Sequence, residues 1–510
     1  MEYKLNKNTA YTVGYALDSV SEQPVDADVT LPDYCPDIER ILRCSINPCV
    51  YSRNVSGGEL SAEGEATIRV LYIDSVKKHI RSFEYRVPWS AAIPLKTPAE
   101  HCAVLLKCKS EYINCRALSP RKLSFHGAFS LYAKAMYREP IEFYHYDEED
   151  DLQTKTESLS VSSLCSLREE WFSHIEDVPL SDRPYVESIL TSCVNVKTTE
   201  QKCMQGKLML TAQGELEVMY LSDLEKGTVE HLSYVFPISR LIDCDGLEED
   251  SVCDIRLDVQ SYELSASRDA LSDGSLLTLD LKLCACVAGY AREKIETITD
   301  AYSIDSAVEL TKTPVKMPKA LSVERITRVE KTTLTVENEK IEEVMDIGVD
   351  SASASVTASD GAPVIRTKLK LCLLMKNPDG DPFFLERSLE FEFSPEIALK
   401  ERTESICVRA DSVSYRIVDE KTLELRIELS YRIVTADTLR FSPVSAIKRC
   451  ENGARAQDDS ALILYFADKG ESLWDISKHY ANRVSDLKEE NALDDDTLSE
   501  PMMLLIPTPN

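Results

Sequence analysis

The sequence is poor in the residues and motifs from which most catalytic sites are built. Only 16 of its 510 residues are glycine, and it contains no GxxxxGK[ST] phosphate loop, no GxGxxG dinucleotide turn and no Gly-x-Ser-x-Gly elbow. None of its seven histidines lies in an HExxH motif or at chelating distance from another His or Cys. The sequence therefore indicates a protein that is not an enzyme, without catalytic residues, metal ligands or a cofactor.

Positive charge is also scarce. The chain has 58 Lys and Arg against 87 Asp and Glu, a formal net charge of −29. Binding to nucleic acid or to an anionic membrane requires clustered Lys and Arg that displace counterions, so this balance argues against both. The first residues lack the apolar region of a signal peptide, and no run approaches the roughly 18–20 apolar residues of a membrane span. We therefore expect a cytoplasmic protein without a transmembrane segment.

The sixteen cysteines are scattered, without a Cys-x-x-Cys motif or a Cys/His cluster. Several lie inside apolar strand patterns, among them Cys284, Cys286, Cys372 and Cys407, where a thiol behaves as a small hydrophobe. Because no export signal accompanies them, we expect reduced structural cysteines rather than disulfides or metal ligands.

A chain of this length exceeds one hydrophobic core, and about 100–200 residues per domain predicts three to five domains. Internal repeats narrow this range. Pro36–Leu42 is echoed 148 positions later by Pro184–Leu190. Both segments place a proline at the first helical position, an acid in the first turn and apolar residues at i, i+3 and i+4, which predicts a short helix near the start of each copy.

Further matches follow at nearly the same spacing. The first two copies share Ala66–Tyr72 with Gly214–Tyr220, Val87–Ser90 with Phe236–Ser239, and Ala103–Tyr112 with Cys253–Tyr262. A third, more diverged copy comprises Thr367–Leu374, Phe391–Phe393, Cys407–Tyr415 and Leu423–Leu429. The last run alternates apolar and charged residues, the pattern of a half-buried strand.

These repeats predict a mainly β protein with three strand-rich domains over residues 1–150, 160–300 and 306–450. Polar stretches mark the expected boundaries: Asp147–Ser158, Glu296–Ser306 and Glu451–Ser460. We interpret the acidic run Asp147–Asp151 as a solvated linker rather than a binding patch.

Residues 460–510 form a separate unit in the order β-α-α-β. Leu462–Phe466 reads as a strand, and Ser472 is a good helix N-cap with Asp475 three residues later, as in a capping box. A second helix is expected to stop at Asn491, which suits the left-handed conformation. Met503–Ile506 is a final strand ended by Pro507.

This unit resembles the LysM domain. The resemblance rests on Gly470-Glu-Ser-Leu-Trp474-Asp-Ile476-Ser, Tyr480, Val484-Ser-Asp-Leu487, Asn491-Ala-Leu493 and Pro501-Met-Met-Leu-Leu-Ile506-Pro507. It implies a small α+β fold that binds N-acetylglucosamine-containing glycans in a shallow groove between the first and last loops. The structural positions it implies are Leu473, Trp474, Ile476, Tyr480, Leu487 and Ile506, with Trp474 packed in the core.

Two departures lie at the groove. Glu471 replaces the usual Asp, and Met502 replaces a glycine where the backbone would approach a sugar. Methionines offer an adaptable apolar surface, so the groove is better suited to a protein than to a glycan. The candidate partner-binding residues are Lys469, Gly470, Glu471, Ser472, Asn491, Met502 and Met503.

The segment Leu31-Pro-Asp-Tyr-Cys-Pro-Asp-Ile38, followed by strand-rich repeats and a LysM-like unit, resembles the SPOCS-domain proteins of spore-forming Firmicutes, specifically the SipL type of clostridia. This resemblance implies a spore coat assembly protein of the mother cell that acts at the forespore surface. Its implied partner is the coat-morphogenesis ATPase of sporulation stage IV, bound through LysM, with other coat proteins as further candidates. The alternative is a LysM protein that binds peptidoglycan or cortex. An enzyme with an unrecognised site comes third.

Overall fold

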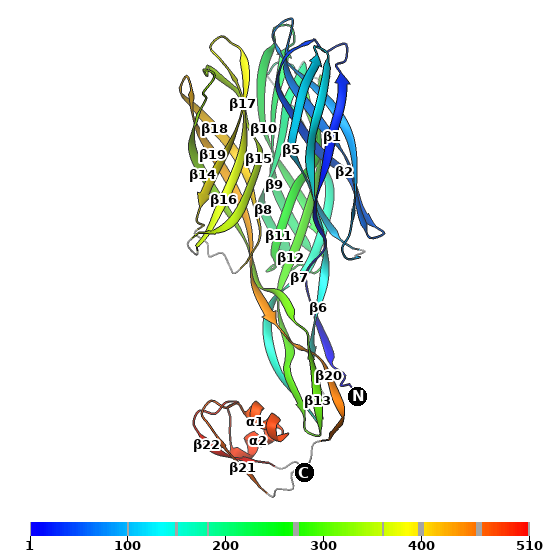
Figure 1. Ribbon diagram of the computed structural model, residues 1–510, viewed down its shortest axis with the longest axis vertical. Coiled ribbons are helices and arrows are strands. Elements are labelled where there is room, and N and C mark those ends of the chain that lie inside the picture. The colour runs from blue at the N-terminus through cyan, green and yellow to red at the C-terminus, as the bar shows by residue number, and fades with distance from the viewer. Residues whose placement is uncertain are drawn as a thin grey trace.

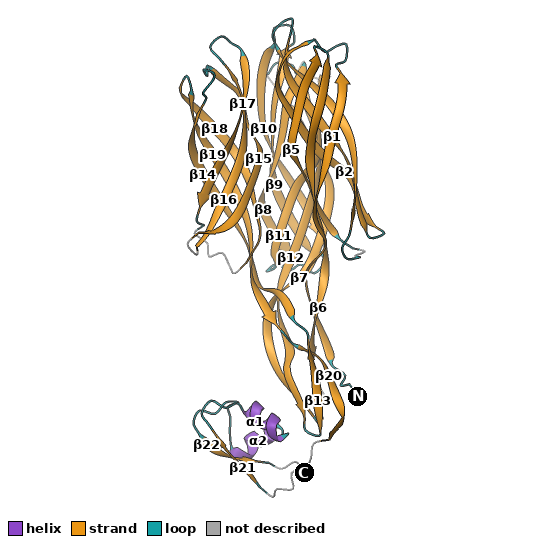
Figure 2. Ribbon diagram, viewed as in Figure 1, coloured by secondary structure: helices purple, strands orange, loops and turns teal. Residues whose placement is uncertain are grey.

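A computed structural model describes residues 2–98, 101–147, 151–180, 183–268, 275–359, 362–395, 402–454 and 462–507. The chain is mainly β, with a small α+β module at its C-terminal end, as predicted (Figures 1 and 2). Three double-sheet units lie side by side, and a narrower stalk leads from them toward the C-terminal module.

Unit 1 consists of two three-stranded antiparallel sheets with the orders β1-β6-β5 and β2-β3-β4. Its strands are β1 (Asn6–Thr30), β2 (Ile38–Ser56), β3 (Glu59–Asp74), β4 (Ile80–Pro94), β5 (Ala103–Ser119) and β6 (Lys122–His145). Apolar side chains of β3 and β6 fill the space between the sheets, including Tyr72 and Phe125.

Unit 2 repeats this topology with the orders β11-β12-β7 and β10-β9-β8. Its strands are β7 (Leu152–Pro179), β8 (Ser188–Met204), β9 (Lys207–Asp223), β10 (Thr228–Asp243), β11 (Val252–Arg268) and β12 (Ser275–Ser303).

Unit 3 has the orders β14-β19-β18 and β15-β16-β17. Its strands are β14 (Val315–Thr335), β15 (Glu343–Ser359), β16 (Ala362–Lys376), β17 (Pro382–Phe393), β18 (Arg402–Asp419) and β19 (Thr422–Phe441). The diverged third copy of the sequence therefore has the same two-sheet topology as the other copies.

The short helix predicted at the start of each copy is wrong. Pro36–Leu42 leads into strand β2, and β-bulges interrupt the β2–β3 pairing between Ile38 and Arg40 and between Ile41 and Arg43. Each bulge adds a residue to the strand, so inward-facing Ile38 and Ile41 are three apart rather than two. Leu42 points away from them into a different core. Bulges in a strand buried on both faces thus mimic the spacing of a helix.

Each unit has an internal apolar core, and all three units also contribute side chains to one shared apolar core. Leu42, Leu190 and Met345 each occupy the bulge of an equivalent strand, β2, β8 or β15. They meet in one cluster with Leu71, Met219 and Leu374, which are the first residues paired beyond those bulges on β3, β9 and β16. Equivalent residues of three repeats therefore build one common core.

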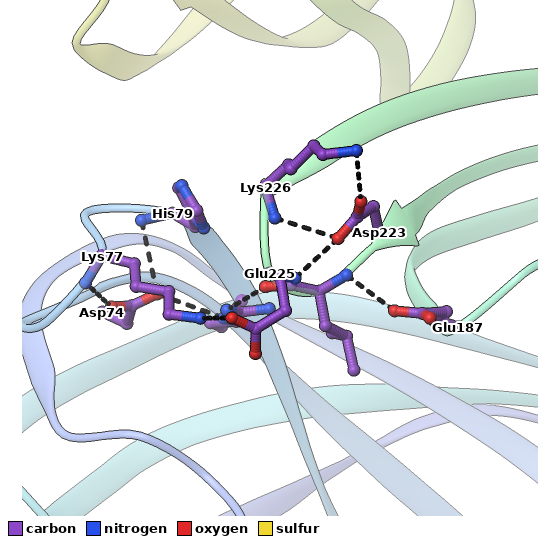
Figure 3. Close-up of polar contacts among 9 residues, drawn as sticks. Asp74, Lys77, His79, Glu187, Asp223, Glu225 and Lys226 are labelled. Carbon is purple, nitrogen blue, oxygen red and sulfur yellow. Dashed lines mark hydrogen bonds and ion pairs between the residues drawn. The ribbon is translucent and has the colours of Figure 1, made fainter.

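Equivalent hairpin turns lie next to this core. Asp74 caps the β3–β4 turn by accepting hydrogen bonds from the backbone N–H groups of Val76 (3.1 Å) and Lys77 (2.6 Å). Asp223 caps the β9–β10 turn in the same way, through Glu225 (2.8 Å) and Lys226 (3.0 Å). The two turns face each other, and Lys77 forms an ion pair with Glu225 (Figure 3). Glu225 lies 148 positions later and is therefore the equivalent residue of the next repeat.

The expected boundaries are not linkers where the structure describes them. Leu152–Ser158 is the first part of β7 and pairs with Glu296–Ser303 at the end of β12. These strand ends, with β13 (Ser306–Lys312) and β20 (Val444–Ala454), form the stalk. Residues 148–150 and 455–460 of the predicted boundaries lie outside the described residues. Asp151, expected to be solvated, accepts a hydrogen bond from Tyr3 (2.9 Å) and forms an ion pair with Arg449 (2.6 Å).

Candidate functional site

The C-terminal module comprises β21 (Ile463–Ala467), α1 (Leu473–Tyr480), α2 (Val484–Asn491) and β22 (Met502–Ile506). The two helices pack on one face of the two-stranded sheet around a small core of their own. Leu473, Ile476, Leu487 and Ile506 are buried there, and Tyr480 packs at its edge against Tyr465. These side chains hold the loops of the module in place.

Trp474 lies outside that core, so the prediction that it packs inside the module is wrong. Its indole ring packs edge-on against Tyr302 of β12, with ring centroids 4.9 Å apart, and its Nε1 donates a hydrogen bond to Asp300 Oδ2 (2.9 Å). Leu473 precedes it on α1 and occupies the core position. Trp474 therefore joins the module to the stalk.

Three further contacts reinforce this junction. Lys478, one turn after Trp474, donates to both carboxylate oxygens of Asp300 at 2.7 Å. The Tyr302 hydroxyl donates to the backbone carbonyl of Asn482 (2.5 Å). We call Asp300, Tyr302, Trp474 and Lys478 the clamp. Burial by itself raises the pKa of Asp300, but the hydrogen bonds from Lys478 and Trp474 outweigh it and hold that pKa below its ordinary value.

The two loops that would border a LysM groove are joined by backbone hydrogen bonds. Gly470, at φ +89°, donates to Leu498 O (2.9 Å), and Leu498 donates to Glu471 O (3.0 Å). A positive φ favours glycine, so Gly470 is required by the turn itself. Exposed carboxylates surround these loops, namely Asp468, Asp494, Asp495, Asp496 and Glu500, with Lys469 among them. The rim is therefore acidic.

Two groove residues behave differently from the sequence prediction. Ser472 makes no side-chain capping bond; α1 instead begins with the Asp475 N–H donating to the Ser472 carbonyl (3.1 Å). The left-handed residue after α2 is Ala492, at φ 53°, not Asn491. The Asn491 amide bonds the backbone of Leu505 through both its oxygen (2.7 Å) and its nitrogen (2.8 Å). Asn491 thus ties α2 to β22.

The face of the sheet that points away from the helices is apolar and exposed. Phe466 and Met503 are paired across β21 and β22 and are 78% and 52% exposed. Leu464, 50% exposed, is paired with Leu505 on the same face. We call Leu464, Phe466, Met503 and Leu505 the apolar sheet face. Met502 instead packs against the core.

Sequence reasoning singled out Met503 but missed Leu464 and Phe466. A signal was available, because side chains in a strand alternate between faces. Residues 462, 464 and 466 must share a face, and all three are large and apolar. A strand in which both faces are apolar, next to helices that can cover only one, indicates an exposed patch.

The motif Leu31–Ile38 at the start of unit 1 forms a loop that presents an aromatic side chain. The Arg121 guanidinium donates to the carbonyls of Leu31 (3.2 Å), Pro32 (2.9 Å) and Cys35 (3.1 Å) and to Asp37 (2.9 Å). The loop is therefore wrapped around one cation, and Tyr34 at its tip is 85% exposed.

A cavity of about 1590 Å³ lies between the three units, lined by strands that include β2, β8 and β15. Its walls carry charges of both signs, such as Arg43, which pairs with Asp350 (3.3 Å). Burial raises the pKa of Glu217 and of Asp346 on the same walls. In the part of the chain that the structure describes, no group of three or more His, Cys, Asp or Glu could hold a metal ion.

Comparisons with known proteins identify the families of these parts. The family described as SipL, SPOCS domain, matches residues 37–118 and 185–267, which span β2–β5 of unit 1 and β8–β11 of unit 2. The LysM domain family matches residues 468–507. Neither a curated protein nor a solved structure matches the chain.

Both families are non-catalytic binding or adaptor domains. No helix in the described ranges is long and apolar enough to cross a membrane. The two matched segments begin 148 residues apart, the same spacing as the internal repeat. The chain thus carries SPOCS-domain segments followed by a C-terminal LysM domain, the order of domains in the SipL-type architecture.

Proposed function

We propose that this protein is a non-enzymatic adaptor in spore coat assembly. In this proposal residues 1–150, 160–300 and 306–450 are SPOCS-like domains that form a scaffold, and the LysM domain, residues 460–510, docks to the coat-morphogenesis ATPase of sporulation stage IV. The protein acts in the mother cell and is recruited to the forespore surface. The domain families support the sporulation setting, and the surface of the LysM domain supports a protein partner.

The apolar sheet face is the observation that carries the docking proposal. Large side chains that remain exposed together on a small domain mark a protein interaction site. The clamp lies on the helical side of the domain, through Trp474 and Lys478 on α1, so it leaves the apolar sheet face open. The acidic rim beside it favours a partner with basic groups over an anionic glycan.

The test is affinity capture of the full chain from sporulating cells, followed by detection of the ATPase. Phe466→Glu places a charge at the centre of the apolar sheet face and should reduce capture at least tenfold. Val76→Glu, at a residue 77% exposed in unit 1, is the matched control and should capture as much ATPase as the unaltered protein.

Circular dichroism of both variants checks that neither change unfolds the protein. Capture that survives Phe466→Glu in a folded protein would contradict docking through this face, and absence of the ATPase from the unaltered capture would contradict the choice of partner.

The second candidate is binding to peptidoglycan or cortex, favoured by the LysM match itself, because LysM is a glycan-binding domain. Its test is sedimentation of the full chain with purified peptidoglycan. Saturable binding that Phe466→Glu leaves unchanged would favour the glycan over the protein partner.

A further inference from the structure

Two pairs of cysteines face each other inside the repeat units. The sulfur atoms of Cys203 and Cys253 lie 3.2 Å apart. The thiols of Cys44 and Cys115 also neighbour each other, and both side chains pack against the same core cluster of unit 1. All four are free thiols in the structure. Each pair therefore brings together two groups that could form a covalent bond.

The two pairs occupy equivalent strands of different units. Cys44 lies on β2 and Cys115 on β5 of unit 1, and Cys203 lies on β8 and Cys253 on β11 of unit 2. In unit 1, β2 is an edge strand of one sheet and β5 is an edge strand of the other. In unit 2, β8 and β11 hold the same two positions. Each pair thus spans the two sheets along the same side of its unit, where no β-ladder between them is formed.

We propose that Cys203–Cys253 and Cys44–Cys115 are oxidation sites, each closing to a disulfide that joins the two sheets of its unit. A disulfide has an S–S length of about 2.05 Å, so the sulfur atoms of Cys203 and Cys253, which lie 3.2 Å apart, must move closer together to form the bond. In unit 2 the two edges are held by side-chain packing and by hydrogen bonds from side chains, such as Gln201 Nε2 to Cys253 O (3.2 Å), and the disulfide adds a covalent link.

The reaction is thiol–disulfide exchange with a low-molecular-weight disulfide as oxidant. The thiolate of one cysteine attacks a sulfur of the oxidant and releases one small thiol, forming a mixed disulfide. The second cysteine, as its thiolate, then attacks the protein sulfur of that mixed disulfide and releases the other small thiol. Two protein thiols are oxidised, the oxidant is reduced to two thiols, and no other reactant is needed.

The surroundings distinguish the attacking cysteine from the resolving one. Cys253 is 2% exposed, whereas Cys203 is partly exposed and can meet a small oxidant. The hydrogen bond from Cys253 lowers the pKa of Cys203, which favours its reactive thiolate. In unit 1 the neighbouring thiol of Cys44 lowers the pKa of Cys115 in the same way.

Unit 3 has no such pair among its described residues. Its cysteines are Cys372, buried on the central strand β16, and Cys407, exposed on the edge strand β18. The equivalent edge strand β15 contains no cysteine. Oxidation should therefore link the two sheets within units 1 and 2 and form no such link in unit 3.

The experiment treats the full-length reduced protein with oxidised glutathione, alkylates the remaining thiols and maps the peptides by mass spectrometry. Four of the sixteen cysteines should become resistant to alkylation, in peptides that link Cys203 to Cys253 and Cys44 to Cys115. The thermal midpoint should rise, because a disulfide restricts the unfolded chain, and dithiothreitol should reverse the rise.

Cys203→Ser should abolish the first link and retain the second, and Cys407→Ser, at an exposed cysteine of unit 3, should retain both. Cys115→Ser is the reciprocal variant and should retain only the Cys203–Cys253 link. The proposal is overturned if exposed Cys407 and Cys450 are oxidised while all four paired cysteines remain open to alkylation, or if the linked peptides join different chains.

Discussion

The LysM domain and the three repeat units bury their apolar side chains in different ways. The LysM domain closes a core around Leu473, Leu487 and Leu504 that includes no residue from outside it. The units each have an internal core, but they also meet in one cluster to which Leu42, Leu190 and Met345 contribute from three separate repeats. The first arrangement makes a domain that can be perturbed alone; the second makes the repeats depend on one another.

This difference separates two roles within one chain. A scaffold gains rigidity when its units share a core, because a shift of one unit disturbs the packing of the other two. A docking domain with its own core can bind and release without such a disturbance. The clamp fixes the LysM domain against the end of β12.

The largest loss of folding stability is expected for Leu190→Ala. Leu190 is fully buried in the shared core, and truncation of a buried leucine costs roughly 2–5 kcal/mol. Because three units border the cavity that is created, we expect hydrogen exchange to increase in β3, β9 and β16 together. Urea unfolding followed by circular dichroism measures the loss of stability.

Val76→Ala provides the control, because Val76 lies at a nearby turn and is exposed. An increase in exchange restricted to unit 2 would show that the shared core does not couple the repeats.

A more local effect is expected for Leu487→Ala, which removes a buried side chain from the LysM core. The cost is again roughly 2–5 kcal/mol, but it falls on two helices and two strands only. Hydrogen exchange should rise in α1, α2 and β22, while the exchange of β3, β9 and β16 stays unchanged. If the repeat units also lost protection, the two regions would not be independent.

The sequence allowed the repeats and the LysM domain to be predicted, because both depend on local patterns. A 148-residue spacing survives in apolar strands such as Ala66–Tyr72, and Gly470, Leu473 and Leu487 follow from turn and helix geometry. The helix at Pro36 was wrong because bulges give a strand the spacing of a helix. A single sequence does not distinguish the two when both faces are buried.

The clamp could not be predicted for a different reason. Trp474 and Asp300 are 174 positions apart, and nothing near either residue indicates the other. The helical pattern of α1 places Trp474 next to the core position Leu473, which favoured core packing. Only the three-dimensional arrangement shows that the stalk supplies a carboxylate and an aromatic ring for this side chain.

The smallest change in stability is expected when low pH protonates Asp300 in the clamp. The pKa of Asp300 is lowered in the folded protein, so its contribution to stability is present above the ordinary carboxyl pKa of about 3.9 and is lost as the pH falls through the lowered value. Hydrogen exchange of residues 474–482 should therefore increase at acid pH before that of the LysM core strand β22.

Asp300→Asn tests the same contact at neutral pH, because the amide removes the charge that Lys478 pairs with while keeping the size of the side chain. This variant should expose residues 474–482 at every pH and abolish the acid-dependent step, with β22 still protected. Glu296 is an exposed carboxylate four residues before Asp300 on β12, and Glu296→Gln should leave the acid-dependent step in place. If the step survives Asp300→Asn, a carboxylate other than Asp300 is responsible for it, and the ion pair between Asp300 and Lys478 does not control the junction.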